Sequence, residues 1–129
     1  MQTTPKTAAQ LVSKAKQQIE NRTPDQVAEL ERGQVVLVDL REPQERTQTG
    51  AIPSAVHAPR GMLEFYADPA SAYHRPEFDP SRRTILYCAS GGRSALAVVA
   101  LQQLGYSDIA HLDGGLKAWT ASGREVHQA

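Results

Sequence analysis

The hydrophobic and polar positions of this chain follow two patterns: short continuous apolar runs, and stretches in which apolar residues recur every three or four positions. The runs QVVLVDL at 34–40 and RTILYC at 83–88 are rich in β-branched and aliphatic residues, which is typical of strands buried on both faces of a parallel sheet. Two shorter runs, AVHA at 55–58 and SDIAHL at 107–112, predict two more strands.

Amphipathic or largely apolar segments separate these runs and predict helices. A helix over 24–32 has clear start and stop signals, with Thr23 as N-cap, Gln26 at the capping-box position and Gly33 as terminator. The other predicted helices lie at 7–19, within 41–50, and at 60–66, 91–105 and 114–123. The stretch 67–83 has no period and several prolines, so we expect a long surface loop there.

This alternation of strands and helices predicts an α/β fold, with a central, mainly parallel sheet and helices on both faces. A chain of 129 residues is long enough for one hydrophobic core. In such sheets, ligands bind beyond the carboxyl ends of the strands. Asp39 and Cys88 both fall at such ends, so we expect them at one rim of the sheet.

Composition narrows the possible partners. Lysine plus arginine equals aspartate plus glutamate, 14 each, so no strong overall field favours nucleic acid or an anionic membrane. No stretch approaches the roughly 18 apolar residues of a membrane-spanning helix, and the N-terminus lacks an apolar signal core, so we expect a cytoplasmic protein. One cysteine and four unpaired histidines argue against a disulfide or a metal site.

The single cysteine, Cys88, lies in the sequence CASGGRS at the junction of a predicted strand and helix. A lone cysteine is more often inert packing, but here the neighbours favour chemistry. Backbone N–H groups of residues 89–94 and the positive end of the helix can stabilise a thiolate, and Gly91 and Gly92 permit the turn that this requires. Arg93 adds a positive charge for the thiolate or for an anionic substrate. We therefore predict Cys88 as nucleophile and, as substrate-binding residues, Ala89, Ser90, Gly91, Gly92, Arg93 and Ser94.

The spacing between Cys88 and Arg93 bears on the type of chemistry. Cysteine-dependent phosphatases have five residues between the corresponding cysteine and arginine, whereas this chain has four. A shorter loop makes a tighter cavity, better matched to one extra sulfur atom on Cys88 than to a phosphoryl group.

Three segments of the chain resemble motifs of the rhodanese-type sulfurtransferases. CASGGRS fits their active-site form Cys-x-x-Gly-x-Arg-Ser, VDLREPQE resembles their strand and acidic loop, and HLDGGLKAWTASG resembles their C-terminal signature. A fourth element departs from the family: its Gly-His-Ile-Pro-Gly-Ala is GAIPSA here, with Ala51 and Ser54 in place of His and Gly. The resemblance extends over 23–129 as a rhodanese-like domain, and leaves 1–22 as an N-terminal helical extension.

The resemblance implies a rhodanese-like three-layer fold and a double-displacement reaction. In this reaction Cys88 takes a sulfane sulfur from a small anionic donor such as thiosulfate, forms a persulfide, and passes the sulfur to cyanide, a thiol or a sulfur-carrier protein. No cofactor is required. Two alternatives remain open: a rhodanese-like interaction or regulatory module with little turnover, and a cysteine phosphatase.

Outside the loop, we interpret three residues as supporting the site. Asp39 and Arg41 are predicted to form an ion pair that holds one loop against another, and Arg60 is predicted near the pocket mouth, where it would attract the anionic donor. His57 and His111 lie in or beside short strands, where a packed, hydrogen-bonded imidazole is more usual than a general base.

Overall fold

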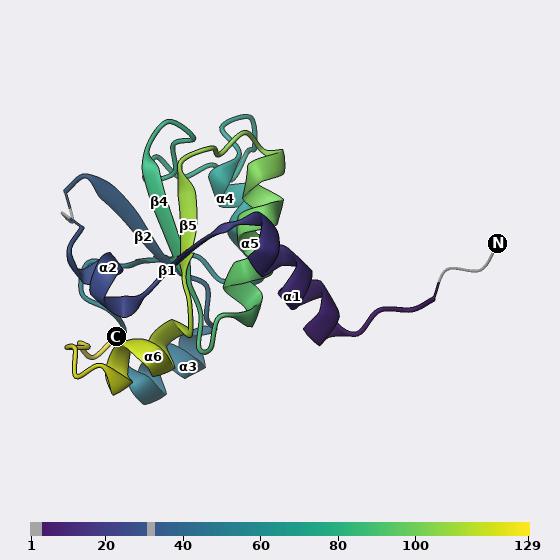
Figure 1. Cartoon of the computed structure of the whole chain (residues 1–129). Helices are drawn as coiled ribbons and strands as arrows, with labels where there is room; N and C mark the ends of the chain where they lie inside the picture. Colours follow the sequence, from purple (N-terminus) through teal and green to yellow (C-terminus); the bar gives the residue numbers. More distant parts are fainter. Residues whose placement is uncertain (1–3, 31–32) are drawn as a thin grey trace.

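Five parallel strands form the centre of the protein in a computed structural model that describes residues 4–30 and 33–129. The strand order is β1-β5-β4-β2-β3, and every neighbouring pair is parallel (Figure 1). The strands are β1 (Glu20–Arg22), β2 (Val35–Asp39), β3 (Val56–His57), β4 (Arg83–Tyr87) and β5 (Ile109–Leu112). The predicted strands at 34–40, 55–58, 83–88 and 107–112 are thus confirmed.

Helices cover both faces of the sheet, as the α/β pattern predicts (Figure 1). The helices are α1 (Ala8–Gln18), α2 (Pro24–Ala28), α3 (Pro43–Thr49), the 3₁₀ turn η1 (Arg60–Met62), α4 (Leu63–Ala67), α5 (Gly92–Gln103) and α6 (Gly115–Ala121). Residues 68–82 contain neither helix nor strand, in agreement with the predicted loop.

The core consists of two clusters, one on each face of the sheet. Successive residues of a strand point to opposite faces, so Val36 and Val38 pack with α4 and α5 whereas Leu37 packs with α2 and α6. All three are at most 4% exposed. This double burial explains why the strand runs in the sequence are continuously apolar rather than alternating.

The helix predicted over 24–32 is shorter than expected. The predicted capping box is present, with Thr23 and Gln26 bonding each other's backbone N–H groups. The helix nevertheless ends at Ala28: the N–H of Glu29 still bonds the carbonyl of Asp25 in the helical pattern, whereas the N–H of Leu30 bonds the carbonyl of Val27, three residues back, which tightens the last turn. Residues 31 and 32 of the predicted helix lie outside the described residues.

The N-terminal segment forms an edge strand of the sheet in addition to the predicted helix. Helix α1 packs on α5 and buries Ala15 (Figure 1). After it, β1 pairs with β5, with Asn21 beside His111 in the register. The sequence did not predict this edge strand, because Glu-Asn-Arg has no strand-like pattern. The division at residues 22 and 23 remains a prediction.

Within residues 4–30 and 33–129, no helix is long and apolar enough to cross a membrane.

Candidate active site

The loop after β4 holds Cys88 at the carboxyl end of the sheet. Strand β4 ends at Tyr87, and α5 begins four residues after Cys88, at Gly92. Gly91, the N-cap of α5, has φ +104°, a backbone conformation that favours glycine. Gly92 does not share this conformation, because it is the first helical residue. Only one of the two glycines that the sequence pointed to therefore provides the turn.

Two backbone N–H groups point at the sulfur of Cys88. The N–H of Gly91 donates to Sγ at 3.2 Å and that of Ser94 at 3.4 Å. The sulfur therefore accepts two backbone hydrogen bonds from its own loop. The thiol is free and the residue is 1% exposed.

The start of α6 fixes the other side of this loop. The N–H groups of Leu116 and Lys117 donate to the carbonyls of Cys88 and Ala89, at 2.9 and 3.0 Å. This close approach needs Gly115, since a Cβ there would lie 2.5 Å from the carbonyl oxygen of Cys88. With these two carbonyls held by α6, the loop can direct N–H groups toward the sulfur.

Arg93 is engaged by Glu45 from α3. Its Nη1 and Nη2 donate to the two carboxylate oxygens of Glu45, both at 2.8 Å. These hydrogen bonds lower the pKa of Glu45 to about 2 and raise that of Arg93 further above its usual value. Glu45 also accepts the N–H of Glu42 in a capping box at the start of α3. The positive charge beside the cysteine loop is thus balanced in this structure by a carboxylate.

Asp39 and Arg41 form the ion pair that the sequence analysis predicted, and both are almost fully buried. Asp39 accepts the N–H and Nε of Arg41 on Oδ1, and Nη2 of Arg41, Nε of Arg46 and the hydroxyl of Tyr87 on Oδ2. Burial alone would raise the pKa of Asp39, but the hydrogen bonds from Arg41 and Tyr87 outweigh it and the pKa is lowered.

Arg41 connects this ion pair to the end of α3. Its guanidinium donates to Thr49 Oγ1 at 2.7 Å and to the carbonyl of Gly50 at 2.5 Å, so it holds the loop after α3 against the end of β2. The predicted supporting residue Arg60 instead pairs with Glu64 one turn later, at 2.7 Å. Its placement at the pocket mouth remains a prediction.

The segment that departs from the family motif lies against the C-terminal residues and contains a turn with a positive φ. Ala51 pairs with His127 in an antiparallel bridge, through two backbone hydrogen bonds of 2.8 Å. Ser54, at the position where the motif has glycine, has φ +73°. A left-handed backbone is unfavourable for a residue with a Cβ, so Ser54 retains the turn at some cost in stability.

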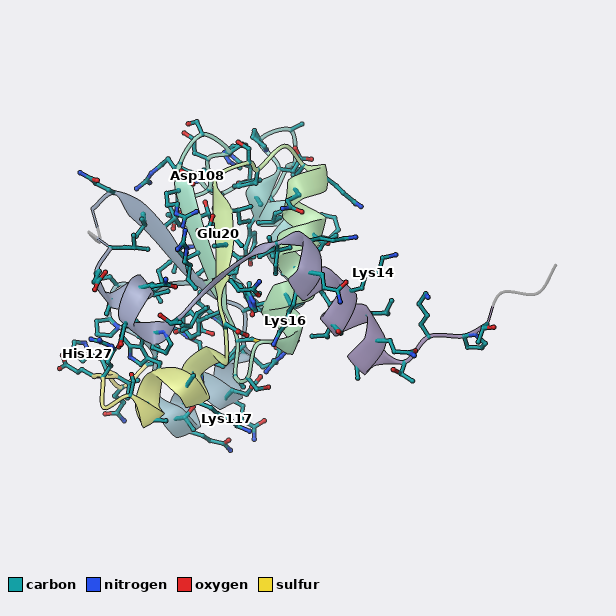
Figure 2. All side chains as sticks on the ribbon, viewed as in Figure 1. Lys14, Lys16, Glu20, Asp108, Lys117 and His127 are labelled. Carbon is teal, nitrogen blue, oxygen red and sulfur yellow. The ribbon has the colours of Figure 1, made fainter. Side chains whose placement is uncertain are left out.

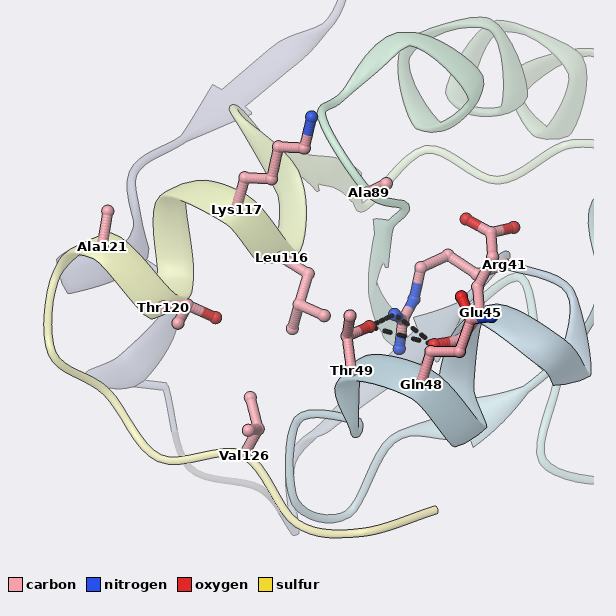
Figure 3. Close-up of a pocket in the computed structure, with 10 residues that line it drawn as sticks. All are labelled: Arg41, Glu45, Gln48, Thr49, Ala89, Leu116, Lys117, Thr120, Ala121 and Val126. Carbon is pink, nitrogen blue, oxygen red and sulfur yellow. Dashed lines mark hydrogen bonds between the residues drawn. The ribbon is translucent and has the colours of Figure 1, made fainter.

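A pocket of about 710 Å³ adjoins the cysteine loop, between α3, α6 and the C-terminal segment (Figure 3). Leu116 and Val126 point into it, and Ala89 lies at its edge next to the cysteine loop (Figure 3). Its lining residues are Arg41, Glu45, Gln48, Thr49, Ala89, Leu116, Lys117, Thr120, Ala121 and Val126. Of residues 88–94, Ala89 alone lines the pocket, so the pocket lies beside the cysteine loop and the sulfur of Cys88 is not part of its wall.

The sequence analysis missed the partners of Ser94. Its hydroxyl lies 2.8 Å from Nδ1 of His111, whose Nε2 lies 2.8 Å from Oδ1 of Asn21. Burial lowers the pKa of His111 to about 4, so this buried imidazole is neutral at pH 7. No spacing in the sequence signals these contacts, because the sheet register brings β1, β5 and α5 together. Among the described residues, no group of three His, Cys, Asp or Glu side chains is arranged to hold a metal ion.

Comparison with known protein families shows that residues 23–122 match the sequence profile of the rhodanese-like domain. The chain belongs to this family. This rhodanese-like chain is 36% identical to a solved structure from Rhodopseudomonas palustris, RPA3614, described as a protein of unknown function and "possible tyrosine phosphatase". The two match over 98% of each chain, with a TM-score of 0.89.

Two curated relatives of the rhodanese-like domain are named for sulfur transfer. The probable adenylyltransferase/sulfurtransferase MoeZ of Mycobacterium tuberculosis is 33% identical over 66% of this chain. The thiosulfate sulfurtransferase GlpE of Pseudomonas syringae is 29% identical over 74% of this chain and 82% of its own length. The chain spans only about a fifth of the length of MoeZ.

Proposed function

We propose that this protein is a sulfurtransferase that moves a sulfane sulfur from a donor such as thiosulfate to a thiophilic acceptor, through a persulfide on Cys88. The observation that carries this proposal is the cysteine loop itself. The sulfur of Cys88 accepts N–H groups from Gly91 and Ser94, in a loop with four residues between cysteine and arginine. The family and the names of its relatives support a sulfurtransferase.

The reaction needs two displacements at sulfur. The Cys88 thiolate attacks the outer sulfur of thiosulfate, and sulfite leaves with the electron pair of the broken S–S bond. The N–H groups of Gly91 and Ser94 stabilise the thiolate before attack and the sulfur anion after it. A nucleophilic acceptor, for example cyanide, then attacks the outer sulfur of the persulfide, and Cys88 leaves as thiolate. In this scheme a donor anion competes with Glu45 for the guanidinium of Arg93.

Intact mass and thiocyanate release test the proposal together. We expect thiosulfate to add one sulfur atom to the protein and cyanide to remove it as thiocyanate, with neither event in Cys88→Ser. Absence of sulfur uptake by the folded wild-type protein would overturn the proposal and favour an interaction module.

A second candidate, a cysteine phosphatase, is favoured by the description of the R. palustris structure. The four-residue spacing between Cys88 and Arg93 opposes it, because a phosphate needs a wider loop. Hydrolysis of an aryl phosphate that depends on Cys88, without sulfur uptake, would establish this candidate instead.

A further inference from the structure

The hydroxyl of Ser94 is the third polar group at the sulfur of Cys88, and its hydrogen has several acceptors within reach. Its oxygen lies 3.6 Å from Sγ, 2.8 Å from Nδ1 of His111 and 3.3 Å from the carbonyl of Gly91. A hydroxyl has one hydrogen to donate and two lone pairs. Whether the sulfur faces the hydrogen or a lone pair therefore depends on His111.

Asn21 determines which nitrogen of His111 carries the proton. Its side-chain Nδ2 donates to the carbonyls of Lys16 at 2.9 Å and Ile19 at 3.2 Å, so its Oδ1 must face His111. Because Oδ1 can only accept, Nε2 of His111 must be the protonated nitrogen, and Nδ1 of the neutral ring is an acceptor. The hydroxyl of Ser94 then donates to Nδ1 of His111 at 2.8 Å, which is a shorter contact than the 3.3 Å to the carbonyl of Gly91.

We propose that His111 and Asn21 are positioning residues that hold the hydroxyl hydrogen of Ser94 away from the sulfur of Cys88, so that this hydroxyl opposes the stabilisation that the N–H groups of Gly91 and Ser94 give to a thiolate. In this arrangement a lone pair of Ser94 faces the sulfur. The thiol can donate its S–H to that lone pair, whereas the thiolate is repelled by it. This inference rests on the proposed role of Cys88 as the nucleophile.

The buried and half-buried charges around this chain of contacts are paired, and Lys117 at the start of α6 is exposed. Arg93 on α5, five residues after Cys88, is neutralised by Glu45 of α3. Lys16 of α1 and Asp113, which follows β5, act on His111 in opposite directions and pair with each other at 3.0 Å. His111 is neutral, so we infer that it affects the sulfur of Cys88 through the direction in which the Ser94 hydroxyl points.

The pH dependence of alkylation of the full chain by iodoacetamide tests the proposal, because only the thiolate reacts. In His111→Leu, the Ser94 hydroxyl loses its acceptor at Nδ1, and an ionised sulfur is a stronger acceptor for its hydrogen than the neutral carbonyl of Gly91 at 3.3 Å. We expect the midpoint of the alkylation profile to fall by about one pH unit, the size expected for one hydrogen bond to a charged group. Most of this fall should vanish when Ser94→Ala is added. An unchanged midpoint, or a rise as expected if His111 were a base for Cys88, would overturn the proposal.

A second variant keeps the test decisive if His111→Leu fails to fold. Asn21 is exposed, and Asn21→Asp places a carboxylate at Nε2 that favours the doubly protonated imidazole. Nδ1 then donates to Ser94, whose own hydrogen is free for the sulfur. We expect alkylation at pH 6 to become several-fold faster, whereas direct repulsion by the new charge would slow it.

The matched control is Gln18→Glu, which adds the same charge at an exposed position of the same segment. Equal rates in Asn21→Asp and Gln18→Glu would overturn the proposal. Sulfur uptake from thiosulfate, measured on the same proteins, separates this result from the proposed function. Alkylation needs only the thiol, so either proposal can fail while the other holds.

Discussion

The buried carboxylate of Asp39 offers a severe test of how the rim of the sheet is stabilised. The change Asp39→Asn preserves shape but replaces one acceptor oxygen by an NH₂ donor. Three donors face Oδ2, from Arg41, Arg46 and Tyr87, and two donors from Arg41 face Oδ1. Whichever way the amide turns, its NH₂ group meets at least two donors.

The expected loss follows from the burial of the pair. Asp39 is 0% and Arg41 1% exposed, so the substitution leaves a buried guanidinium without its main counter-ion. Breaking a buried pair in this way costs about 3–5 kcal/mol, a large part of the roughly 5–15 kcal/mol that stabilises a typical domain. We expect a loss of this size in the free energy of unfolding, measured with urea at 25 °C.

The control for this prediction is Asp108→Asn, which breaks an ion pair with Arg83 at the opposite end of the sheet. The Asp108 side chain is 56% exposed, and Figure 2 shows it near Glu20, which pairs with the same arginine. Exposed pairs contribute about 0–1 kcal/mol, so we expect a loss in that range. If Asp39→Asn lost no more than Asp108→Asn, the reasoning from burial would be refuted.

Three further changes have defined outcomes. Gly115→Ala should reduce the rate of thiocyanate formation at least about tenfold, because its Cβ would displace the carbonyl of Cys88. Ser54→Gly should raise the free energy of urea unfolding by about 0.5 kcal/mol, since relief of the positive φ is partly offset by the freer unfolded chain. Hydrogen bonds from Arg83 lower the pKa of Glu20 from 4.5 to about 2, so Glu20 stabilises the fold fully above pH 4.5. The difference in unfolding free energy between wild type and Glu20→Gln should shrink as the pH falls from 4.5 toward 2.

Each of these predictions has a contrasting measurement. Gly123→Ala shares a positive φ but has open space around it, so it should lose stability and keep activity; equal loss of activity in both glycine variants would contradict the role of the close approach. A loss of stability in Ser54→Gly would show that the serine makes a compensating contact. A constant difference between wild type and Glu20→Gln across the acid range would exclude Glu20 as a source of acid sensitivity.

Local patterns in the sequence correctly predicted those structural features that depend on residues close together in the chain. The buried strands, the capping box at Thr23 and the Asp39–Arg41 pair all involve residues within a few positions of each other. The cysteine loop was located for the same reason, since a strand, a turn and a helix follow one another directly. The sequence could not show which glycine makes the turn, because Gly91 and Gly92 are adjacent and identical. They are distinguished only by the start of α5 at Gly92.

Features that depend on distant segments could not be predicted. Strand β1 is polar and forms only because β5 offers it an unpaired edge. The contacts from Ser94 through His111 to Asn21 join three elements that are up to 90 residues apart in the chain. Both arise from the register of the sheet, which no single segment encodes.

The two outermost strands limit how this protein can associate with copies of itself. A long, flat edge strand presents unpaired N–H and C=O groups on which another chain can add. Here β1 has three residues, of which the first and last are the charged Glu20 and Arg22, and β3 has two. In β3, the backbone carbonyl of His57 accepts a hydrogen bond of 2.9 Å from the guanidinium of Arg75. The sheet is therefore poorly suited to edge-to-edge aggregation, even though its central strands are almost entirely apolar.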